Sequence, residues 1–509
     1  MESIQIRPFD FTVVILYLLG MALFGAYLAK KNKTTEAYFV GNRSFSGWVI
    51  GLSILGTIIS SMTFLTIPAA AYTLDWRQLT SNLTLPLIAI VAIIFFIPVF
   101  RRSRLTTSYE YLDLRFSAVA RWYCVVSGIL FQFFRVSAIL FLVSIPVSMA
   151  TGVDITIIII CMGVFIAFYT VLGGIEAVIW TDVVQAIILL LGGVFAFLVI
   201  VNRLPEGFAQ IIEMGSADNK FSLGEMQVDF GERTFWTVFL LGVFSWIGMY
   251  SNDQTIIQRY VAAKSTKAAR MATTFFSATV VPVWAFFYLI GTSLYVFYKV
   301  NHDPAIAELH ADQIFPYFIL TELPVGITGI IIAGLLAAAM SSLDSSINAV
   351  STVLTVDIAK PYLLKGRTDK FYLNMARIIG IATAIIMILG AIYFSRVPKE
   401  SMNDINWIMS SLLSGGMIGI YIAGIFTTRI DSKALMVALV AAFLVNLYLG
   451  LGMRDIVDNF GIHDYWIGPL VNAVFLTFAF AWSFITGVRP DKENLRNLTV
   501  WTMDKNYKE

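Results

Sequence analysis

The stretch GWVIGLSILGTIISSMTFLTIPAAAY, residues 47–72, is long and apolar enough to cross a bilayer, but its centre is interrupted by small and hydroxylated residues. Gly56, Thr57, Ser60 and Ser61 lie close together in that centre. A helix of this composition can unwind there, and the carbonyl groups that are freed can coordinate a cation. Irregular backbone at membrane depth is tolerated only beside a cavity. The alternative is close packing of helices through small residues, which is common in membranes.

The composition of the whole chain is that of an integral membrane protein. Of its 509 residues, 58% are hydrophobic and only 13% are charged, and the mean hydropathy is +0.78. Runs of about 20 apolar residues are sufficient to cross a bilayer core. The sequence therefore predicts an all-α integral membrane fold with about thirteen transmembrane helices. These runs lie near residues 9–29, 46–72, 80–100, 120–150, 154–172, 177–201, 234–258, 271–298, 323–357, 372–394, 403–428, 433–452 and 465–487.

Lysine and arginine are concentrated in every second loop between these runs. The cationic loops contain Lys30, Lys31, Lys33 and Arg43; Arg101, Arg102, Arg104, Arg115 and Arg121; Arg259, Lys264, Lys267 and Arg270; and Lys360, Lys365, Arg367, Lys370 and Arg377. The apolar runs predict a multi-pass protein of the cell (inner) membrane, and the excess of positive charge marks its cytoplasmic loops. Its N-terminus is expected outside, and its tail, residues 488–509, in the cytoplasm.

Arg135 is the only charged residue in GILFQFFRVSAILFLVSIP, residues 128–146. An arginine at the centre of a bilayer costs roughly 3 kcal/mol on insertion scales, so it is expected to face protein or water and to have a partner. Its planar guanidinium group suits a carboxylate. Arg135 therefore either binds an anionic substrate or forms a structural ion pair.

A second polar pattern lies in MSSLDSSINAVSTVLTVDI, residues 340–358. Ser341, Asp344, Ser345 and Asn348 follow one another at spacings of three or four, so they share one helix face. Hydroxyl groups beside one carboxylate are hard oxygen ligands, which suit a small alkali cation. The alternative is a structural polar seam between helices.

Asp182 is a further acid, in GGIEAVIWTDVVQA, residues 173–186. It is either part of a membrane-embedded site or lies at the cytoplasmic boundary of the membrane.

Several function classes are excluded by what the sequence lacks. The histidines, His302, His310 and His463, all fall in predicted outer loops, so an embedded histidine metal site is not expected. There is no Gly-Lys dipeptide for a phosphate-binding loop and no His-Glu-x-x-His motif. We therefore expect neither an enzyme nor a protein that binds ATP or nucleic acid. A channel or an ion-coupled carrier remains, with the lipid bilayer and a small solute as its partners.

Five stretches together resemble the sodium:solute symporter family. They are SSMTFLTIPAAAY (60–72), LTTSYEYLDLRF (105–116), YTVLGGIEAVIWTDVVQ (169–185), NDQTIIQRYV (252–261) and MSSLDSSINAVSTVLTVDI (340–358). The resemblance implies a LeuT-type core of two inverted five-helix repeats within one transporter unit, residues 9–487. The repeats would be residues 46–201 and 234–428, with a peripheral first helix at 9–29 and extra helices at 433–487.

The same resemblance implies one or two bound Na⁺ ions. The main site would be formed by three carbonyl groups and two hydroxyl groups, those of Gly56, Ile59, Ala338, Ser341 and Ser342. A second, tentative Na⁺ site would use Asp182, Ser341, Asp344 and Ser345. Members of the family often have Ser or Thr where this chain has Asp344, so the extra carboxylate either strengthens sodium binding or binds a proton.

Among members of the family, the chain most resembles bacterial sodium/sialic acid symporters at the positions that line the substrate pocket. The implied substrate residues are Ser60, Ser61, Thr63, Gln78, Asn82 and Arg135. Arg135 would bind the carboxylate of a sugar acid. Asn82 stands where a longer amide is usual, and Gln78 where an aromatic lid is usual. The segment TFWTVFLLGVFSWIGMY, residues 234–250, also resembles the iodide, monocarboxylate and vitamin branch, whose members transport anions too.

Three functions follow as hypotheses. The first is sodium-coupled import, by alternating access, of an anionic organic solute such as sialic acid or a related sugar acid. The second is sodium symport of a different solute: a neutral sugar or polyol, a short monocarboxylate or an amino acid. The third is a channel or a membrane sensor. The absence of a sizeable soluble domain argues against a sensor.

Overall fold

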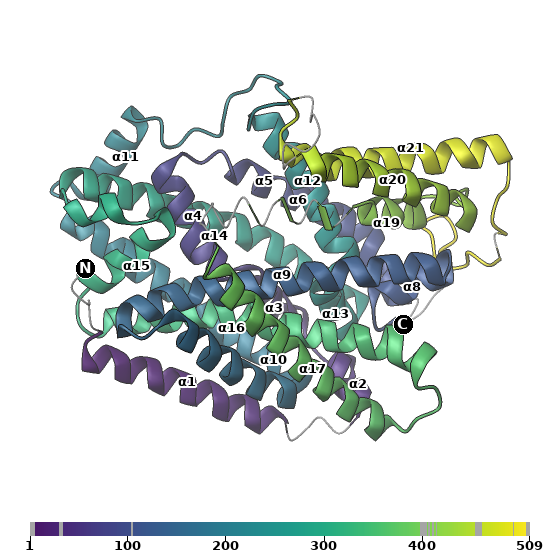
Figure 1. Ribbon diagram of the computed structural model, residues 1–509, viewed down its shortest axis with the longest axis horizontal. Coiled ribbons are helices and arrows are strands. Elements are labelled where there is room, and N and C mark those ends of the chain that lie inside the picture. The colour runs from purple at the N-terminus through teal and green to yellow at the C-terminus, as the bar shows by residue number, and fades with distance from the viewer. Residues whose placement is uncertain are drawn as a thin grey trace.

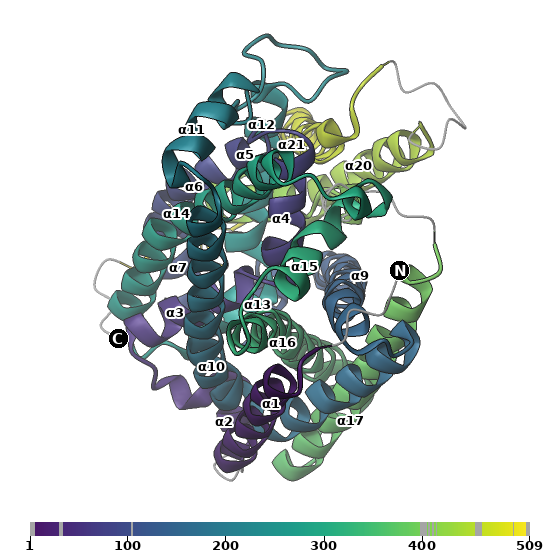
Figure 2. The same ribbon diagram turned by 90° about the vertical axis from the view of Figure 1, so that its left-hand side faces the viewer.

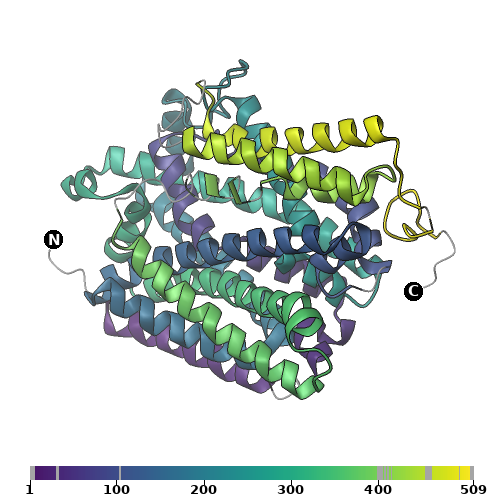
Figure 3. The ribbon, with the colours of Figure 1, turned by 45° about the vertical axis from the view of Figure 1, so that its right-hand side comes forward.

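The computed structural model describes residues 6–29, 34–102, 105–397, 405, 408–409, 412–413, 415–452, 461–491 and 493–504, and contains helices but no strands within them. Most helices run along one direction, horizontal in Figure 1. The first, α1, begins at one end of the bundle, and the last, α21, ends at the opposite end (Figures 1 and 3).

The long helices are α1 (Pro8–Ala29), α9 (Ala118–Thr151), α10 (Ile155–Arg203), α14 (Thr266–Val300), α16 (Ile327–Val353), α17 (Asp369–Phe394), α20 (Ser432–Gly452) and α21 (Ile467–Thr486). The third predicted run is divided into α5 (Leu79–Leu83), α6 (Leu85–Val91), η2 (Ala92–Phe96) and α7 (Ile97–Arg102). Short helices lie between the long helices or extend them. They are α2 (Thr35–Val40), η1 (Gly41–Arg43), α8 (Ser108–Arg115), α11 (Gly207–Ala217), η3 (Pro304–Glu308), α15 (Ala311–Thr321), η4 (Leu354–Leu363) and η5 (Asp464–Trp466).

The described residues contain nine helices that are long and apolar enough to cross a membrane, or ten if one bent pair is counted as a single span. The predicted count of about thirteen is therefore not confirmed. The difference comes from segments that are bent or short. The runs predicted at 154–172 and 177–201 both lie within α10, and Gly174 (φ +54°, ψ −165°) leaves the helical conformation between them, so α10 consists of two helical segments joined at a kink. The run predicted at 403–428 is described as the short helix α19 (Met417–Phe426), and part of it lies outside the described residues.

Three of these segments have identifiable interruptions. Helices α3 (Gly47–Ile58) and α4 (Ser61–Thr73) meet at a bend of 55°. Helices α12 (Phe235–Asn252) and α13 (Gln254–Ala262) are separated at one residue, Asp253. Helix α10 changes direction at Gly174, where φ is +54°, a conformation that glycine adopts without a steric penalty. The interruptions at α3–α4 and α12–α13 fall in the first span of each predicted five-helix repeat.

Helix α16 is the centre of the bundle. It packs against α1, α3, α9, α10 and α17, and nearly all of its residues are buried (Figure 2). Burial on all sides leaves the polar residues of α16 without access to water. The serines, Asp344 and Asn348 of its polar face must therefore find their partners inside the protein.

The peripheral helices expose large apolar side chains instead. Leu23 on α1, Leu389 on α17 and Ile485 on α21 are 72%, 62% and 81% exposed. In water such a surface would be unfavourable, but lipid tails solvate it. Helices α20 and α21 lie together at the edge farthest from α1 (Figure 1).

A buried lysine ties the long loop after α11 to the end of α4. The ammonium group of Lys220 donates hydrogen bonds to the carbonyl oxygens of Tyr72 (2.7 Å) and Leu74 (2.9 Å), and lies 4.0 Å from the centre of the Tyr295 ring. Carbonyl groups at a helix C-terminus have no partner within the helix, and a cation is favourable there. Lys220 therefore holds the end of the half-helix whose other end is the interruption at residues 59–60.

We expect Lys220→Met to lower the free energy of unfolding by about 2 kcal/mol, because two partly buried carbonyl groups lose a charged donor. Thermal unfolding of the purified protein would measure the loss. Lys299→Met is the matched control, since Lys299 forms an exposed ion pair with Asp218 whose contribution should be below about 1 kcal/mol. Equal effects of the two substitutions would contradict the anchoring role of Lys220.

Candidate functional site

The interruption between α3 and α4 has a local cause. Ile59 (φ −82°, ψ 95°) and Ser60 (φ −105°, ψ −176°) both leave the helical conformation. The Ser60 hydroxyl oxygen then accepts a hydrogen bond from the backbone N–H of Met62 (3.2 Å), which caps the first turn of α4. The Leu55 carbonyl oxygen still accepts a hydrogen bond from the backbone N–H of Ile59 (2.9 Å), but the later carbonyl groups of α3 are at the helix end and are available to other groups.

The polar face of α16 lies directly against this interruption. The Ser342 hydroxyl donates to the Thr57 carbonyl oxygen (2.8 Å) and lies 3.5 Å from the Ala338 carbonyl oxygen. At Gly56, a Cβ atom would lie 3.2 Å from the Ser341 hydroxyl oxygen and 2.8 Å from a backbone oxygen of α10, so only glycine fits without a shift. Gly56 therefore lies next to Ser341, and the Ser342 hydroxyl contacts the end of α3; of the other residues predicted for the main Na⁺ site, Ala338 lies one turn before Ser342 on α16 and Ile59 follows the last residue of α3.

The donor set of this region fits an alkali cation. Its oxygens are carbonyls and hydroxyls, which are hard, neutral ligands. No group of three or more His, Cys, Asp or Glu side chains suited to a metal occurs in the described part of the chain, so a multivalent metal centre is not indicated there.

Asp182 lies next to the same region and is completely buried inside the protein. Its carboxylate accepts hydrogen bonds from the Ser53 and Ser341 hydroxyl groups and from the Arg259 guanidinium group, at 2.6 Å for the last. The carboxylate thus links α3, α10, α13 and α16.

Arg259 differs most from its sequence-based prediction. The charge pattern predicts it in a loop, but in the structure it is completely buried on α13. Besides Asp182, its guanidinium donates to the hydroxyl groups of Ser53 (2.8 Å) and Ser345 (2.7 Å) and to the Thr255 carbonyl oxygen (2.6 Å). The apolar residues around it in TIIQRYVAA were the signal that could have identified it, as they did for Arg135.

The residues predicted for the second Na⁺ site are close together but have different partners. Arg259 donates hydrogen bonds directly to Asp182 and Ser345, and Ser341 is connected to Arg259 through its hydrogen bond to Asp182. Asp344 instead accepts hydrogen bonds from Tyr169 (3.2 Å) and Thr181 (3.4 Å) on α10, with Ser345 at 3.4 Å. A cation at this position would have to share Asp182 and Ser345 with a guanidinium group.

A cavity of about 220 Å³ lies on the other side of the interruption. Five of the six residues predicted to bind substrate line it: Ser60, Thr63, Gln78, Asn82 and Arg135. The sixth, Ser61, is not among the lining residues; its hydroxyl donates to the Ile139 carbonyl oxygen (3.2 Å) on α9.

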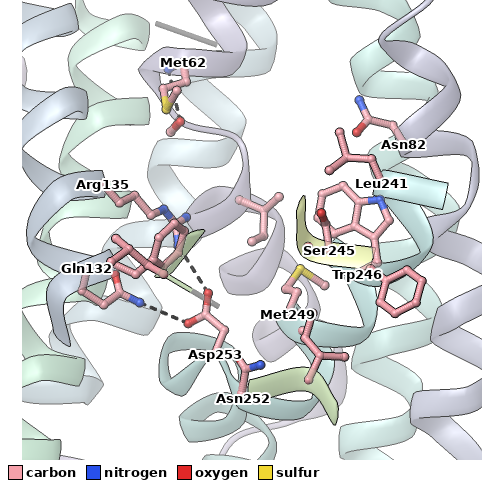
Figure 4. Close-up of a pocket in the computed structure, with 18 of the residues that line it drawn as sticks. Met62, Asn82, Gln132, Arg135, Leu241, Ser245, Trp246, Met249, Asn252 and Asp253 are labelled. Carbon is pink, nitrogen blue, oxygen red and sulfur yellow. Dashed lines mark hydrogen bonds and ion pairs between the residues drawn. The ribbon is translucent and has the colours of Figure 1, made fainter. Parts of the chain in front are cut away.

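The walls of the cavity include aromatic residues that the sequence analysis did not identify. Trp246 on α12 stacks against Trp284 on α14, with ring centres 5.2 Å apart, and Tyr288 lies next to them. Figure 4 shows Trp246 and Asn82 facing Arg135 across the cavity. Aromatic faces beside polar side chains are suited to a ligand that has both apolar and hydrogen-bonding surfaces.

Arg135 both faces the cavity and has an ionic partner, so the two interpretations of this residue are not exclusive. One guanidinium nitrogen lies 3.4 Å from a carboxylate oxygen of Asp253, and the other terminal nitrogen lies 3.4 Å from the Thr57 carbonyl oxygen. Gln132 donates to the second carboxylate oxygen of Asp253 (3.3 Å), as the dashed lines in Figure 4 show. Asp253 was missed, although it is the only acid between residues 234 and 262.

The model of the sodium:solute symporter family matches residues 38–441. The sodium/sialic acid symporter SiaT of Proteus mirabilis (strain HI4320) is 31% identical over 87% of this chain and 90% of its own length.

Two solved structures are similar along most of the chain. A substrate-bound, outward-open Na⁺-coupled sialic acid symporter has a TM-score of 0.86 and 28% identity, covering 94% of this chain and 98% of that one. Mhp1, a nucleobase-cation-symport-1 family transporter, has a TM-score of 0.61 at 14% identity, covering 92% and 98%, and shows similarity of fold alone.

The predicted fold class, an all-α LeuT-type membrane transporter, is confirmed by these structures. Sodium as the coupling ion and a transport function in place of an enzymatic one are confirmed as well. The chain belongs to the sodium:solute symporter family.

Proposed function

We propose that this symporter imports an anionic organic solute together with Na⁺, and that the solute is sialic acid or a related sugar acid. The observation that carries the proposal is the position of the Thr57 carbonyl group. It accepts a hydrogen bond from Ser342, on the side of the candidate sodium site, and lies 3.4 Å from Arg135, on the side of the cavity. An ion that fixes this segment of backbone therefore also orders the wall of the substrate pocket.

In this proposal Gly56, Ile59, Ala338, Ser341 and Ser342 hold Na⁺. The bound ion draws α3 towards α16 and favours the conformation in which Ser60 and Thr63 face the solute. Coupling of this kind is reciprocal, so the solute must raise the affinity for Na⁺ by the same factor.

Charge balance supports an anionic solute. Arg135 and Asp253 cancel each other in the cavity, as Arg259 and Asp182 do beside the sodium site. The main sodium site has neutral ligands, so one bound Na⁺ adds a single positive charge, which a monoanion nearby would compensate. A second Na⁺ at Asp182, Ser341, Asp344 and Ser345 would make transport electrogenic.

The proposed topology completes the mechanism. The N-terminus is outside, the C-terminal tail is cytoplasmic, and residues 46–201 and 234–428 are inverted repeats that exchange access to the central site. Each net positive charge that enters an inside-negative cell at 100 mV contributes about 2.3 kcal/mol.

Uptake by proteoliposomes would test the proposal. Labelled N-acetylneuraminic acid should accumulate above its external concentration with an inward Na⁺ gradient, and should not accumulate with K⁺ in place of Na⁺. Excess sugar acid should compete with the label, whereas glucose and myo-inositol should not. Competition by a neutral sugar but by no acid would contradict an anionic substrate.

Ser342→Ala should weaken Na⁺ binding at least tenfold, which corresponds to about 1.4 kcal/mol, because one oxygen ligand is lost. Isothermal calorimetry with NaCl would measure this affinity. Ser346→Ala is the matched control, since Ser346 is a buried serine on the same helix whose hydroxyl has no hydrogen-bond partner among the described residues. Unchanged Na⁺ affinity in Ser342→Ala would argue against this site.

A further inference from the structure

The position of Asp253 poses a physical problem for an anionic solute. Arg135 is the proposed partner of the solute carboxylate, yet a carboxylate of the protein already lies 3.4 Å from its guanidinium group. A solute carboxylate at Arg135 would therefore stand next to Asp253, and two like charges in a partly dry site repel each other. A solute that binds well must offset this repulsion.

Asp253 is held firmly in place. One of its carboxylate oxygens accepts hydrogen bonds from the backbone N–H (2.8 Å) and the hydroxyl group (2.7 Å) of Thr255, so that Asp253 caps α13. The same oxygen accepts a third hydrogen bond from the side-chain amide of Gln132 (3.3 Å). The other oxygen, at 3.4 Å from Arg135, has only that long contact in the described structure. Asp253 therefore stays in the wall of the cavity with one oxygen free to accept a further hydrogen bond.

Arg135 in turn has donor capacity to spare. A guanidinium group carries five N–H donors, and only two contacts, both at 3.4 Å, are made to described residues. A solute carboxylate can thus bind to Arg135 without complete removal of Asp253. The two groups then act as one unit, with a donor fork and a charged acceptor side by side.

A second hydrogen-bond acceptor, on Gln132, also requires a solute that supplies a donor. The side-chain oxygen of Gln132 is buried and has no hydrogen-bond partner among the described residues, while its amide nitrogen is directed to Asp253 (Figure 4). Leaving a buried acceptor unpaired is costly, so a ligand that supplies a donor here is favoured.

We infer that Asp253, with Gln132, makes the symporter selective for carboxylic acids that carry a hydroxyl or amino donor on the carbon next to the carboxylate. The short distance between Arg135 and Asp253 requires the two recognised groups to be adjacent in the solute. Such a donor converts the repulsion from Asp253 into a charge-assisted hydrogen bond. An acid without the donor leaves Asp253 facing an anion. This inference rests on the proposed function, since it needs a carboxylate at Arg135.

Matched pairs of acids test the inference on the intact protein. The pairs are N-acetylneuraminic acid and its 2-deoxy analogue, gluconate and 2-deoxygluconate, and lactate and propionate, each measured by thermal stabilisation in NaCl. We expect the hydroxylated member to bind about 100-fold more tightly in every pair that binds, since a site built around a hydroxyl group strongly rejects the analogue without it. Equal binding of both members overturns the inference and leaves the proposed function standing. If neither member of any pair binds, the proposed function itself fails.

The variant Asp253→Asn tests whether Asp253 causes the preference for the hydroxylated acid in each pair. Asparagine caps a helix as well as aspartate does, so α13 should persist, and the midpoint of unfolding without ligand checks this. The preference within each pair should fall below about tenfold, mainly because the deoxy acids bind more tightly once the repulsion is gone. Asp154→Asn is the control: Asp154 caps α10 in the same way but is exposed and outside the cavity, so the preference should stay at its original value. A preference that persists in Asp253→Asn would overturn the role of Asp253.

Discussion

Replacement of Arg259 by methionine is expected to destabilise the protein more than any other single substitution considered above, by about 3–5 kcal/mol. Arg259 and Asp182 are both completely buried, and their groups lie 2.6 Å apart. Methionine keeps most of the side-chain volume but removes the charge, which leaves the Asp182 carboxylate without a counter-ion in a dry interior. Thermal unfolding in detergent, with and without Na⁺, would measure the change.

Two further variants make the test specific. The double variant Asp182→Asn, Arg259→Met should recover most of the lost stability, because a buried ion pair can often be replaced by neutral residues at little cost. Arg203→Met removes an exposed partner of Glu322 and should cost less than about 1 kcal/mol. A loss below about 1 kcal/mol for Arg259→Met would show that water or another cation compensates Asp182.

Replacement of Arg135 by alanine is expected to abolish uptake of the anionic solute and to weaken its binding at least 100-fold, or about 2.7 kcal/mol. The substitution removes the guanidinium group from the cavity and also leaves Asp253 uncompensated beside the solute. Arg135→Lys should be intermediate, since lysine keeps the charge but loses the planar fork. Calorimetric titration with the solute in NaCl would give the affinities.

The stabilisation of the Arg135→Ala protein by Na⁺ alone should persist, which separates lost recognition from misfolding. The double variant Arg135→Ala, Asp253→Asn should bind the solute better than Arg135→Ala does, because it removes the uncompensated carboxylate as well. Anion uptake within about threefold of the wild type in Arg135→Ala would mean that the ion pair with Asp253 is purely structural.

The membrane class, the helical fold and the polar face of α16 could all be predicted from the sequence, because each depends on local composition and periodicity. The division of the span at 234–258 into α12 and α13 could not, whereas the boundary between the runs 154–172 and 177–201 coincides with the kink at Gly174. Such bends depend on what packs against a segment as much as on its own residues. Packing also explains why Ser61 does not line the cavity. The direction in which α4 leaves the interruption turns the Ser61 hydroxyl towards α9.

The pairing of charges is what only the tertiary structure decided. The sequence alone established that Arg135 stands in an apolar segment, where it needs a partner, and it left Asp182 either in an embedded site or at the membrane boundary. It could not identify those partners, because Asp253 is 118 residues from Arg135 and Arg259 is 77 residues from Asp182. Both partners come from α12–α13, the second interrupted span, and reach Arg135 on α9 and Asp182 on α10 only when that span packs against α3 and α16. A buried charge makes a partner necessary, whereas packing determines which one it finds.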